Sequence, residues 1–387
     1  MMRSDLAVKR AREIFGDQIN DVQERVRSGE LNRRAEPPSR AKAKAVIAEE
    51  VPNAGTTELP TGGPPAPARR RATRAIVPPA SPEPEAARGV DESARVAQGE
   101  MAEQGARALD KIKAGRDSEV TTTEAAGLEA LVLLEGRPAL LVQDGHFFPP
   151  PDKWKILDQF RAGIESTIAR VGRIEVNNHP DYKWVGTGFL VGPNAIMTNR
   201  HVAVEFFAQK AAGKKWSYIT PRKARIDFRE EFGGLASDEH EITDIIGIHE
   251  KVDLALLKVK WSSGTQPDPL QVVAKEPKGI VGLKVYVVGY PAWDGRRNDP
   301  EWIRKIFTNI FDVKRLQPGQ IKGVKAFVED HDCSTLGGNS GSAVFALETQ
   351  TVVGLHYGGE FQVGNNAVPL WKLAKDPLLK KAKVNFV

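Results

Sequence analysis

Residues 332–345 of this 387-residue chain read DCSTLGGNSGSAVF and place Ser340 inside a cluster of glycines. Glycine weakens a strand, so such a cluster marks a backbone that takes tight conformations or that another backbone approaches closely. A serine on such a turn presents its hydroxyl outward, and the surrounding N–H groups can converge on a developing oxyanion. On this stretch alone, a nucleophile and a glycine-rich surface turn are equally good interpretations.

Working outward, the chain from about residue 173 consists of short apolar runs separated by Gly, Pro, Asn and Asp. Examples are GTGFLVG (186–192), LKVYVVGYP (283–291) and TVVGLHYGG (351–359). Many short strands with regular turn residues predict an all-β fold. About 200 residues are too many for one small barrel and suit two antiparallel β-barrels. The final run PLWKLAKDPLLKKAK (369–383) predicts a C-terminal helix that covers the base of a barrel.

The N-terminal third has a different composition. Residues 4–35 carry one apolar stripe, which fits one face of an amphipathic helix with Gly16 as a weak point. A stripe this thin cannot form a core alone, so it would dock on a partner, on another copy or on the later domain; a partly helical tail without a partner is the alternative. Residues 36–90 are rich in Pro, Ala, Gly and Arg and predict an extended, disordered linker. Residues 91–114 look helical, with little to bury.

A lead-in segment precedes the predicted barrels. Thr121 and Glu124 form the two ends of a capping box at the start of TTTEAAGLEALVLL, which predicts a helix. The run PALLVQDG (138–145) predicts a strand that ends in a turn. A second helix-like stretch, WKILDQFRAGIESTIARV (154–171), follows.

The composition limits the classes of partner. A net charge of +5 is mild, and Arg69–Arg71 has no interleaved aromatic residues, so we expect a solvated charge run and no specific nucleic acid. The single cysteine, Cys333, excludes an intramolecular disulfide. The N-terminus lacks the apolar core of a signal peptide, and no run approaches the roughly 18 apolar residues of a membrane span. We therefore expect a cytoplasmic protein. No metal-ligand spacing or phosphate-binding loop occurs, so we expect no metal and no cofactor.

Three stretches carry residue types that suit acyl transfer. His201 follows an apolar strand, Asp253 precedes another, and Ser340 lies in the glycine cluster. A serine hydroxyl needs a neutral imidazole to take its proton, and a carboxylate holds that imidazole in the correct tautomer. Asp244 is a rival for the acid, although Asp253 has the better strand context. The other histidines weighed as competing site residues are interpreted as ordinary surface residues: His146, His179, His240, His249 and His331.

The motifs TNRHVA (198–203), DLALLKV (253–259) and GGNSGSAVF (337–345), in this order, resemble those of trypsin-like peptidases of the chymotrypsin clan. The closest resemblance is to bacterial glutamyl-endopeptidase-like and HtrA-like members without a PDZ domain. It covers roughly residues 165–375 and implies a serine endopeptidase with two trypsin-like barrels. The predicted organisation is then a helical segment, a linker with one helix-like stretch, a lead-in, a peptidase domain and a C-terminal helix end (1–35, 36–120, 121–164, 165–375, 376–387).

The resemblance also implies residue roles. His201 is then the general base, Asp253 the orienting acid and Ser340 the nucleophile, while the N–H groups of Gly338 and Ser340 form the oxyanion hole. Asn339 replaces the aspartate that pairs with a new N-terminus in trypsinogen activation. The pocket is therefore expected to form without cleavage.

The same resemblance implies a set of pocket residues: Ser334, Thr335, His356, Tyr357 and Gly358. Trypsin-like preference for Lys or Arg needs a carboxylate where this chain has Ser334. Thr335 and His356 match the residues with which glutamyl endopeptidases bind a substrate carboxylate, so a preference for Glu or Asp on the acyl side is predicted. Alternatively, H-x-G-G is a wall sequence shared with relatives of other specificity, and a chymotryptic preference stays open.

Two alternatives from other classes stay open. The chain could be a catalytically silent trypsin fold that serves as a binding module. Otherwise the peptidase could be an effector controlled by the N-terminal region, by fold-level analogy with stress-response or defence systems. The expected partners are a protein or peptide substrate and a protein that docks on the N-terminal helices. Self-cleavage is predicted in the linker at its exposed glutamates: Glu49, Glu50, Glu58, Glu83 and Glu85.

Overall fold

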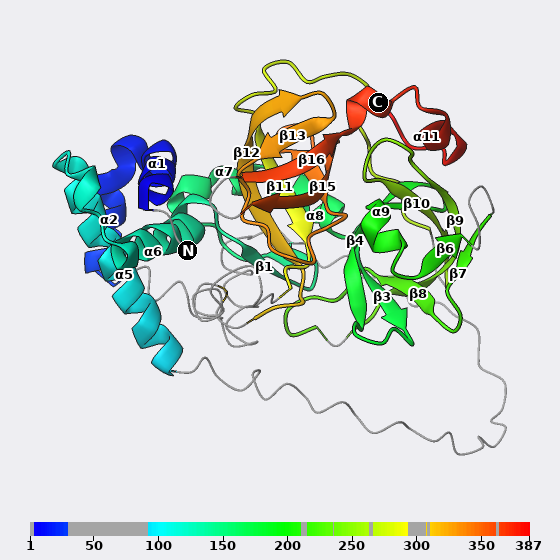
Figure 1. Ribbon diagram of the computed structural model, residues 1–387, viewed down its shortest axis with the longest axis horizontal. Coiled ribbons are helices and arrows are strands. Elements are labelled where there is room, and N and C mark those ends of the chain that lie inside the picture. Colours follow the sequence, from blue (N-terminus) through cyan, green and yellow to red (C-terminus); the bar gives the residue numbers. More distant parts are fainter. Residues whose placement is uncertain are drawn as a thin grey trace, which may run out of the picture.

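A computed structural model gives the structure of the chain (Figure 1). It describes residues 4–29, 92–209, 215–234, 236–262, 266–292, 307, 310–360 and 364–387. The predicted linker (36–90), with its arginine run and its candidate cleavage sites, lies outside the described residues.

Six antiparallel strands close the first barrel, in the order β10-β5-β4-β3-β8-β9. These strands are β3 (Val171–Asn177), β4 (Trp184–Gly192), β5 (Ala195–Thr198), β8 (Lys223–Asp227), β9 (Glu239–Ile248) and β10 (Ala255–Lys260). The sequence forms them because apolar side chains recur on the inward face, where Ile174, Leu190 and Ile226 are fully buried. A small ribbon of β6 (Phe207–Gln209) and β7 (Trp216–Tyr218) lies beside this barrel.

The second barrel also has six antiparallel strands, in the order β11-β14-β15-β16-β13-β12, and pairing of β11 with β12 closes it. The strands are β11 (Lys284–Gly289), β12 (Arg315–Lys325), β13 (Val328–His331), β14 (Ala343–Ala346), β15 (Val352–Glu360) and β16 (Gly364–Pro369). Strands β1 (Leu140–Gln143) and β2 (His146–Phe147) extend its sheet, because β1 pairs with β12. The predicted fold class, two antiparallel barrels, is confirmed.

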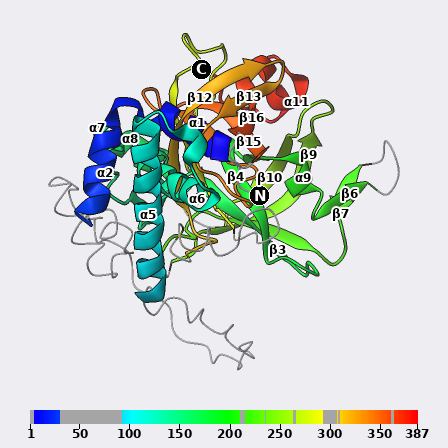
Figure 2. The ribbon, with the colours of Figure 1, turned by 60° about the vertical axis from the view of Figure 1, so that its left-hand side comes forward.

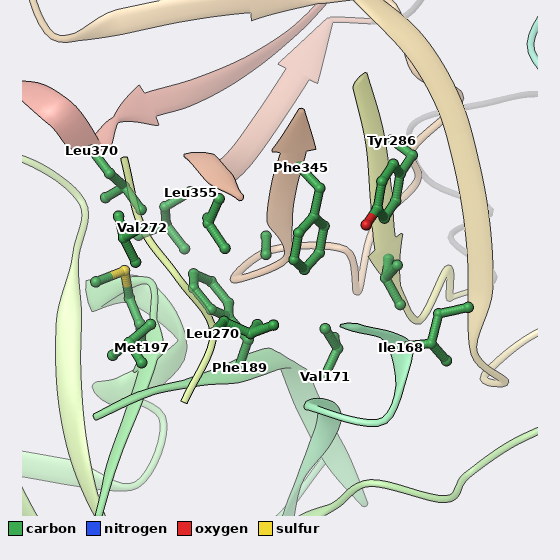
Figure 3. Close-up of a cluster of buried hydrophobic side chains, with 14 of the residues drawn as sticks. Ile168, Val171, Phe189, Met197, Leu270, Val272, Tyr286, Phe345, Leu355 and Leu370 are labelled. Atoms are coloured by element: carbon green, nitrogen blue, oxygen red, sulfur yellow. The ribbon is translucent and has the colours of Figure 1, made fainter. Parts of the chain in front are cut away.

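A shared core joins the two barrels (Figure 3). Phe189 and Met197 enter it from the first barrel, and Tyr286, Phe345 and Leu355 enter it from the second. The rings of Tyr286 and Phe345 stack with centroids 4.9 Å apart. Because dense apolar packing transmits displacements, this core fixes how the edges of the two barrels meet.

The C-terminal segment differs from the single helix predicted for 369–383. A 3₁₀ turn, η6 (Leu370–Leu373), is followed by a separate short helix, α11 (Pro377–Lys381). Asp376 caps α11 by accepting from the N–H groups of Leu378 and Leu379, and Pro377 at its first position cannot continue a preceding helix. Helices α7 (Ile156–Gln159) and α8 (Arg161–Ile168) occupy the predicted second helix of the lead-in.

The N-terminal helices form a bundle with its own core, here called the helical module (residues 4–29 and 92–136; Figure 2). It contains α1 (Ser4–Phe15), α2 (Ile19–Arg27), α5 (Glu92–Lys113), α6 (Thr122–Leu131) and the short turns η1 (Gly16–Gln18), η3 (Asp117–Glu119) and η4 (Val132–Gly136), the last a π-helical turn. The apolar stripe of α1 and α2, the described part of the stripe predicted for residues 4–35, thus docks on α5 and α6 of the same chain.

The interpretation that residues 91–114 have little to bury is wrong. Ala108 and Leu109 of α5 are fully buried, and α5 crosses α6 so closely that an added Cβ at Gly127 would overlap the backbone nitrogen of Gly105. Small residues permit this approach, so the low hydrophobicity of α5 reflects close helix packing. The capping box of Thr121 is confirmed, with both reciprocal hydrogen bonds present. Across the described ranges, every helix falls short of the length and apolar character that a membrane span requires.

Candidate active site

His201 and Asp253 meet at the edge of the first barrel. His201 lies in the short helix α9 (Arg200–Ala203), directly after β5, and Asp253 lies just before β10, the strand that pairs with β5. Nδ1 of His201 is 2.6 Å from Oδ2 of Asp253, and the backbone N–H of His201 donates to Oδ1 at 3.1 Å. Both carboxylate oxygens of Asp253 therefore contact His201, and these two contacts fix the position of its imidazole.

The electrostatics of this pair favour an ionised Asp253. Burial opposes ionisation, yet the hydrogen bond and charge of His201 outweigh it and hold the pKa of Asp253 below its usual range. An ionised carboxylate accepts the Nδ1 proton, so Nε2 of His201 stays free to accept another. The rival acid Asp244 bonds instead to Lys215 and to the backbone of Ile245.

Ser340 lies on a turn of the second barrel that contacts β4 of the first. Its carbonyl accepts from the N–H of Thr187 at 2.8 Å. Gly186 of the same strand lies close to Ser340 and to Val202. An added Cβ at Gly186 would lie 3.0 Å from the carbonyl oxygen of Ser340 and 2.8 Å from a methyl of Val202. Val202 follows His201, so the helix that carries the predicted base and the turn that carries the predicted nucleophile both pack against Gly186 of β4.

Glycine is required on the C-terminal side of Ser340. Gly341 has φ +90°, and an added Cβ would overlap the carbonyl oxygen of Thr187. Its N–H donates to the carbonyl of His356 at 3.0 Å, which ties the turn to β15. The glycine cluster therefore lets three backbone segments meet around Ser340.

The N–H groups of Gly338 and Ser340 have no acceptor within the part of the chain that the structure describes. The turn is held by the N–H of Asn339, which donates to the carbonyl of Leu336 at 3.2 Å, and by Thr187, whose hydroxyl donates to the carbonyl of Gly338. Gly338 has φ +85°. Two backbone donors on a fixed turn are the elements that an oxyanion hole needs.

Asn339 is fully buried and bonds to a neutral partner. Its Oδ1 accepts from Nε2 of Gln317 at 3.0 Å, and its Nδ2 donates to the carbonyl of Leu336 at 3.3 Å. A neutral amide pair thus occupies the place where an aspartate would need a cationic partner. The amide of Asn339 is thus anchored by neutral hydrogen bonds within the second barrel.

His356 and His331 form a buried pair in the second barrel. Nδ1 of His356 is 3.1 Å from Nε2 of His331, and both side chains are almost fully buried. Burial lowers the pKa of His331 to about 4 and that of His356 well below its ordinary value. Both imidazoles are therefore neutral at pH 7, and one N–H joins them.

The interpretation of His331 as a surface residue is wrong, and the reason lies in β13. Residues of this strand alternate between half-buried and buried, which places Glu329 and His331 on the inward face. His240 and His249 are also buried, against the same prediction. His249 accepts from two backbone N–H groups and pairs with Asp376 at 3.3 Å.

The other predicted pocket residues divide into two groups. Thr335, Tyr357 and Gly358 are half-buried, and an added Cβ at Gly358 would meet nothing within 4 Å. Ser334 is buried, and its hydroxyl donates to the carbonyl of Arg137 at 2.7 Å. Ser334 therefore faces the lead-in segment, which the sequence interpretation did not anticipate.

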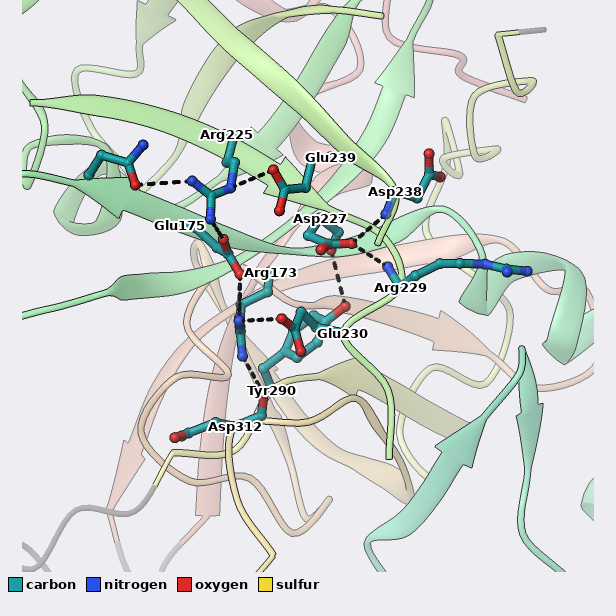
Figure 4. Close-up of polar contacts among 11 residues, drawn as sticks. Arg173, Glu175, Arg225, Asp227, Arg229, Glu230, Asp238, Glu239, Tyr290 and Asp312 are labelled. Carbon is teal, nitrogen blue, oxygen red and sulfur yellow. Dashed lines mark hydrogen bonds and ion pairs between the residues drawn. The ribbon is translucent and has the colours of Figure 1, made fainter. Parts of the chain in front are cut away.

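Three carboxylates could suggest a metal site between the barrels: Glu175, Asp227 and Glu230, whose oxygens lie within 4.8 Å of one another. Figure 4 shows the guanidinium of Arg173 between Glu175 and Glu230, with an ion pair to each. Arg225 binds Glu175 from the other side. Arginine side chains thus pair with Glu175 and Glu230, and Oδ1 of Asp227 accepts from the backbone N–H groups of Arg229 and Asp238. These contacts account for the cluster as a polar network without a metal.

Comparisons with known proteins agree with this architecture. The sequence model of the trypsin-like peptidase domain matches residues 186–355. A probable serine protease of Lysobacter enzymogenes is 30% identical over 302 residues, which cover 67% of this chain and 76% of that protein. A glutamyl endopeptidase of Staphylococcus aureus is 29% identical over 195 residues, which cover 49% of this chain and 51% of the relative.

Among solved structures, a protease of Mycobacterium tuberculosis in its active form is 20% identical, with a TM-score of 0.37 over 57% of this chain and 84% of that one. A serine endoprotease of Yersinia pestis is 18% identical, with a TM-score of 0.39 over 59% and 66% of the two chains. Two closed barrels around a shared core, together with the extended match to a serine protease, define the class. The chain belongs to the trypsin-like serine proteases. Its substrates are proteins or peptides.

Proposed function

We propose that this protease cleaves peptide bonds through an acyl-enzyme on Ser340, with His201 as general base and Asp253 as orienting acid. The observation that carries the proposal is the double contact of Asp253 with His201, at 2.6 Å to Nδ1 and 3.1 Å to the backbone N–H. This contact leaves Nε2 as the free base of the site. A base held in this way, together with a serine on a glycine-rich turn that packs on the neighbouring strand, suits nucleophilic catalysis.

The reaction then follows from these positions. Ser340 Oγ attacks the substrate carbonyl carbon while His201 Nε2 takes its proton, and Asp253 stabilises the imidazolium. The N–H groups of Gly338 and Ser340 donate to the oxyanion. The proton passes from His201 to the leaving amine, and a water molecule repeats the sequence on the acyl-enzyme to release the acid and restore the serine.

A fluorophosphonate probe tests this assignment. The wild-type protein should be labelled, and Ser340→Ala should not be labelled. Peptide hydrolysis should disappear with the same substitution. A chain that resists the probe in every form, while remaining folded, would support the alternative of a catalytically silent binding module.

We also propose a preference for Glu or Asp on the acyl side, supported by Thr335 and His356. Neutral His356 can donate from Nε2 only in the tautomer whose Nδ1 accepts, and in that tautomer Nε2 of His331, 3.1 Å from Nδ1 of His356, is the donor. In this tautomer the Nε2–H of His356 is the group that donates to a substrate carboxylate, and binding of that anion would favour protonation of His356. A peptide panel should show cleavage after Glu; preferred cleavage after Phe, Leu or Arg would contradict the preference.

Two further proposals concern the setting of the enzyme. A cytoplasmic location fits the one cysteine, which is buried and unpaired at position 333. Self-cleavage in the linker follows from a preference for Glu, because several glutamates lie there. Incubation of the wild type beside Ser340→Ala should yield linker fragments from the wild type only; an active enzyme that stays intact over days contradicts self-cleavage.

A further inference from the structure

Arg137, at the junction of the helical module and the second barrel, contacts the pocket segment twice (residues 332–338 are called the pocket segment). Its Nη2 donates to Oδ2 of Asp332 at 2.6 Å, and its backbone carbonyl accepts from the hydroxyl of Ser334 at 2.7 Å. Asp332 Oδ1 accepts from the N–H of Gln320 on β12 at 2.7 Å. One residue therefore fixes both ends of a three-residue stretch that leads to the oxyanion turn.

Arg137 is itself held rigidly. Its side chain is 5% exposed, its N–H donates to the carbonyl of Val132, and its Nη1 donates to the carbonyl of Gly136 at 2.7 Å. Its guanidinium lies 5.4 Å from the ring centre of Trp154, whose Nε1 bonds to the same Gly136 carbonyl at 2.9 Å. A side chain fixed on three sides can transmit its position to its partner.

The helical module also packs on the middle of the pocket segment. Leu336 joins a small apolar cluster with Ala130 and Leu133, which belong to α6 and η4. Leu336 is the residue whose carbonyl accepts from both the backbone and the side chain of Asn339. The module thus supports the turn that presents the N–H groups of Gly338 and Ser340. Figure 1 shows the module beside the second barrel, on the side away from the first.

We infer that Arg137 is a positioning residue that holds the pocket segment in its substrate-binding form and couples this form to the helical module. The inference rests on the proposed function for its catalytic consequences. Because Asn339 pairs with the neutral Gln317, the oxyanion turn has no ionic link of its own. The ion pair of Arg137 with Asp332, two residues before Ser334, supplies the charge-assisted contact for this region without any chain cleavage.

A matched control is available in Arg161. Its guanidinium is also buried, lies 3.8 Å from the ring centre of Phe147 and pairs with Asp158 and Glu165. Among the described residues, its hydrogen bonds and ion pairs stay within residues 147–165 and do not reach the pocket segment. Arg137→Met and Arg161→Met each remove a buried guanidinium over an aromatic ring. Only Arg137→Met also removes a contact with the pocket segment, the ion pair with Asp332.

Cys333 supplies a readout that does not depend on catalysis. It is the single cysteine of the chain, is fully buried, and lies between the two residues that Arg137 binds. Local opening of the pocket segment exposes this thiol, and the rate of modification by a thiol reagent under native conditions measures the opening. In Arg137→Met we expect this rate to rise about tenfold or more, with wild-type-like rates in Arg161→Met.

The closing experiment combines this rate with labelling of Ser340 and with steady-state kinetics on the full chain. Arg137→Met should lower kcat/KM by roughly 100-fold, and adding Asp332→Asn should cause no further loss, because the two groups act as one pair. Unchanged thiol reactivity, additive losses or equal effects of Arg161→Met would overturn the inference.

If Arg137→Met does not fold, Asp332→Asn and Ser334→Ala replace it, and wild-type thiol reactivity in both overturns the inference. Absence of Ser340 labelling in the wild type refutes the proposed function instead, and leaves the thiol measurement as the test of Arg137.

Discussion

Asp253→Asn should inactivate the enzyme through the tautomer of His201, and the geometry shows why. The backbone N–H of His201 donates to Oδ1 of Asp253, so this position must keep an oxygen when the acid becomes an amide. The amide nitrogen then takes the place of Oδ2, 2.6 Å from Nδ1 of His201. An NH₂ group donates, so Nδ1 must accept, and the only proton of the neutral ring moves to Nε2.

A proton on Nε2 prevents His201 from accepting the proton of Ser340. In triads of this type, the substitution lowers kcat by about 10⁴-fold, which corresponds to about 5 kcal/mol of transition-state stabilisation. We expect a loss of this size in peptide hydrolysis, with a parallel loss in the rate of fluorophosphonate labelling. Binding of a peptide to the inactive protein should change little, because the pocket residues keep their contacts.

Asp376→Asn is the matched control for this experiment. Asp376 also pairs with a buried histidine, His249, at 3.3 Å, but this pair lies at the start of α11. Asparagine caps a helix as well as aspartate does, so the variant should fold and keep its activity. An Asp253→Asn enzyme that retains activity within tenfold of wild type would refute the assignment of Asp253.

Three further predictions concern packing and pH. Gly341→Ala should abolish labelling of Ser340 and lower the free energy of unfolding by roughly 1–3 kcal/mol, because the added methyl overlaps the carbonyl of Thr187; unaltered labelling would contradict this. His331 has a pKa of about 4 when folded and about 6.5 when unfolded, so the unfolded state binds more protons below pH 6.5, and stability should fall between pH 6.5 and 4 by up to roughly 3 kcal/mol. Denaturant titrations at several pH values should show that the free energy of unfolding of His331→Gln depends less on pH in this range than that of the wild type. Gly127→Ala should separate α6 from α5 at Gly105, and faster proteolysis of the helical module than of the barrels would reveal it; equal proteolysis in wild type and variant would contradict the close crossing.

The barrels could be predicted from the sequence because their information is local. Alternating apolar runs and turn residues define each strand, and the short motifs around His201, Asp253 and Ser340 mark where strands end at the barrel edge. The sequence predicts a surface position for His331 although β13 alternates, because a polar run such as VEDH carries no apolar signal of its inward face.

Arg137 could not have been recognised from the sequence. Its partner Asp332 lies 195 positions away, and no pattern in LLEGRPAL marks an arginine that pairs with the pocket.

The sequence does not predict the core of the helical module, for a different reason. α5 is rich in small and polar residues, and its burial depends on the crossing of Gly105 and Gly127, which only the packed helices show.

The packing of α1 and α2 on α5 and α6 changes what cleavage of the linker would produce. The linker joins α2 to α5, and both helices belong to one buried core, with Val22 and Leu109 among its members. A cut between them leaves two polypeptides held together by that core, as in fragment complementation. The nicked enzyme would migrate as one species in gel filtration and as two bands under denaturing conditions. Severing the linker therefore yields a two-chain protease, and the catalytic barrels keep their helical support.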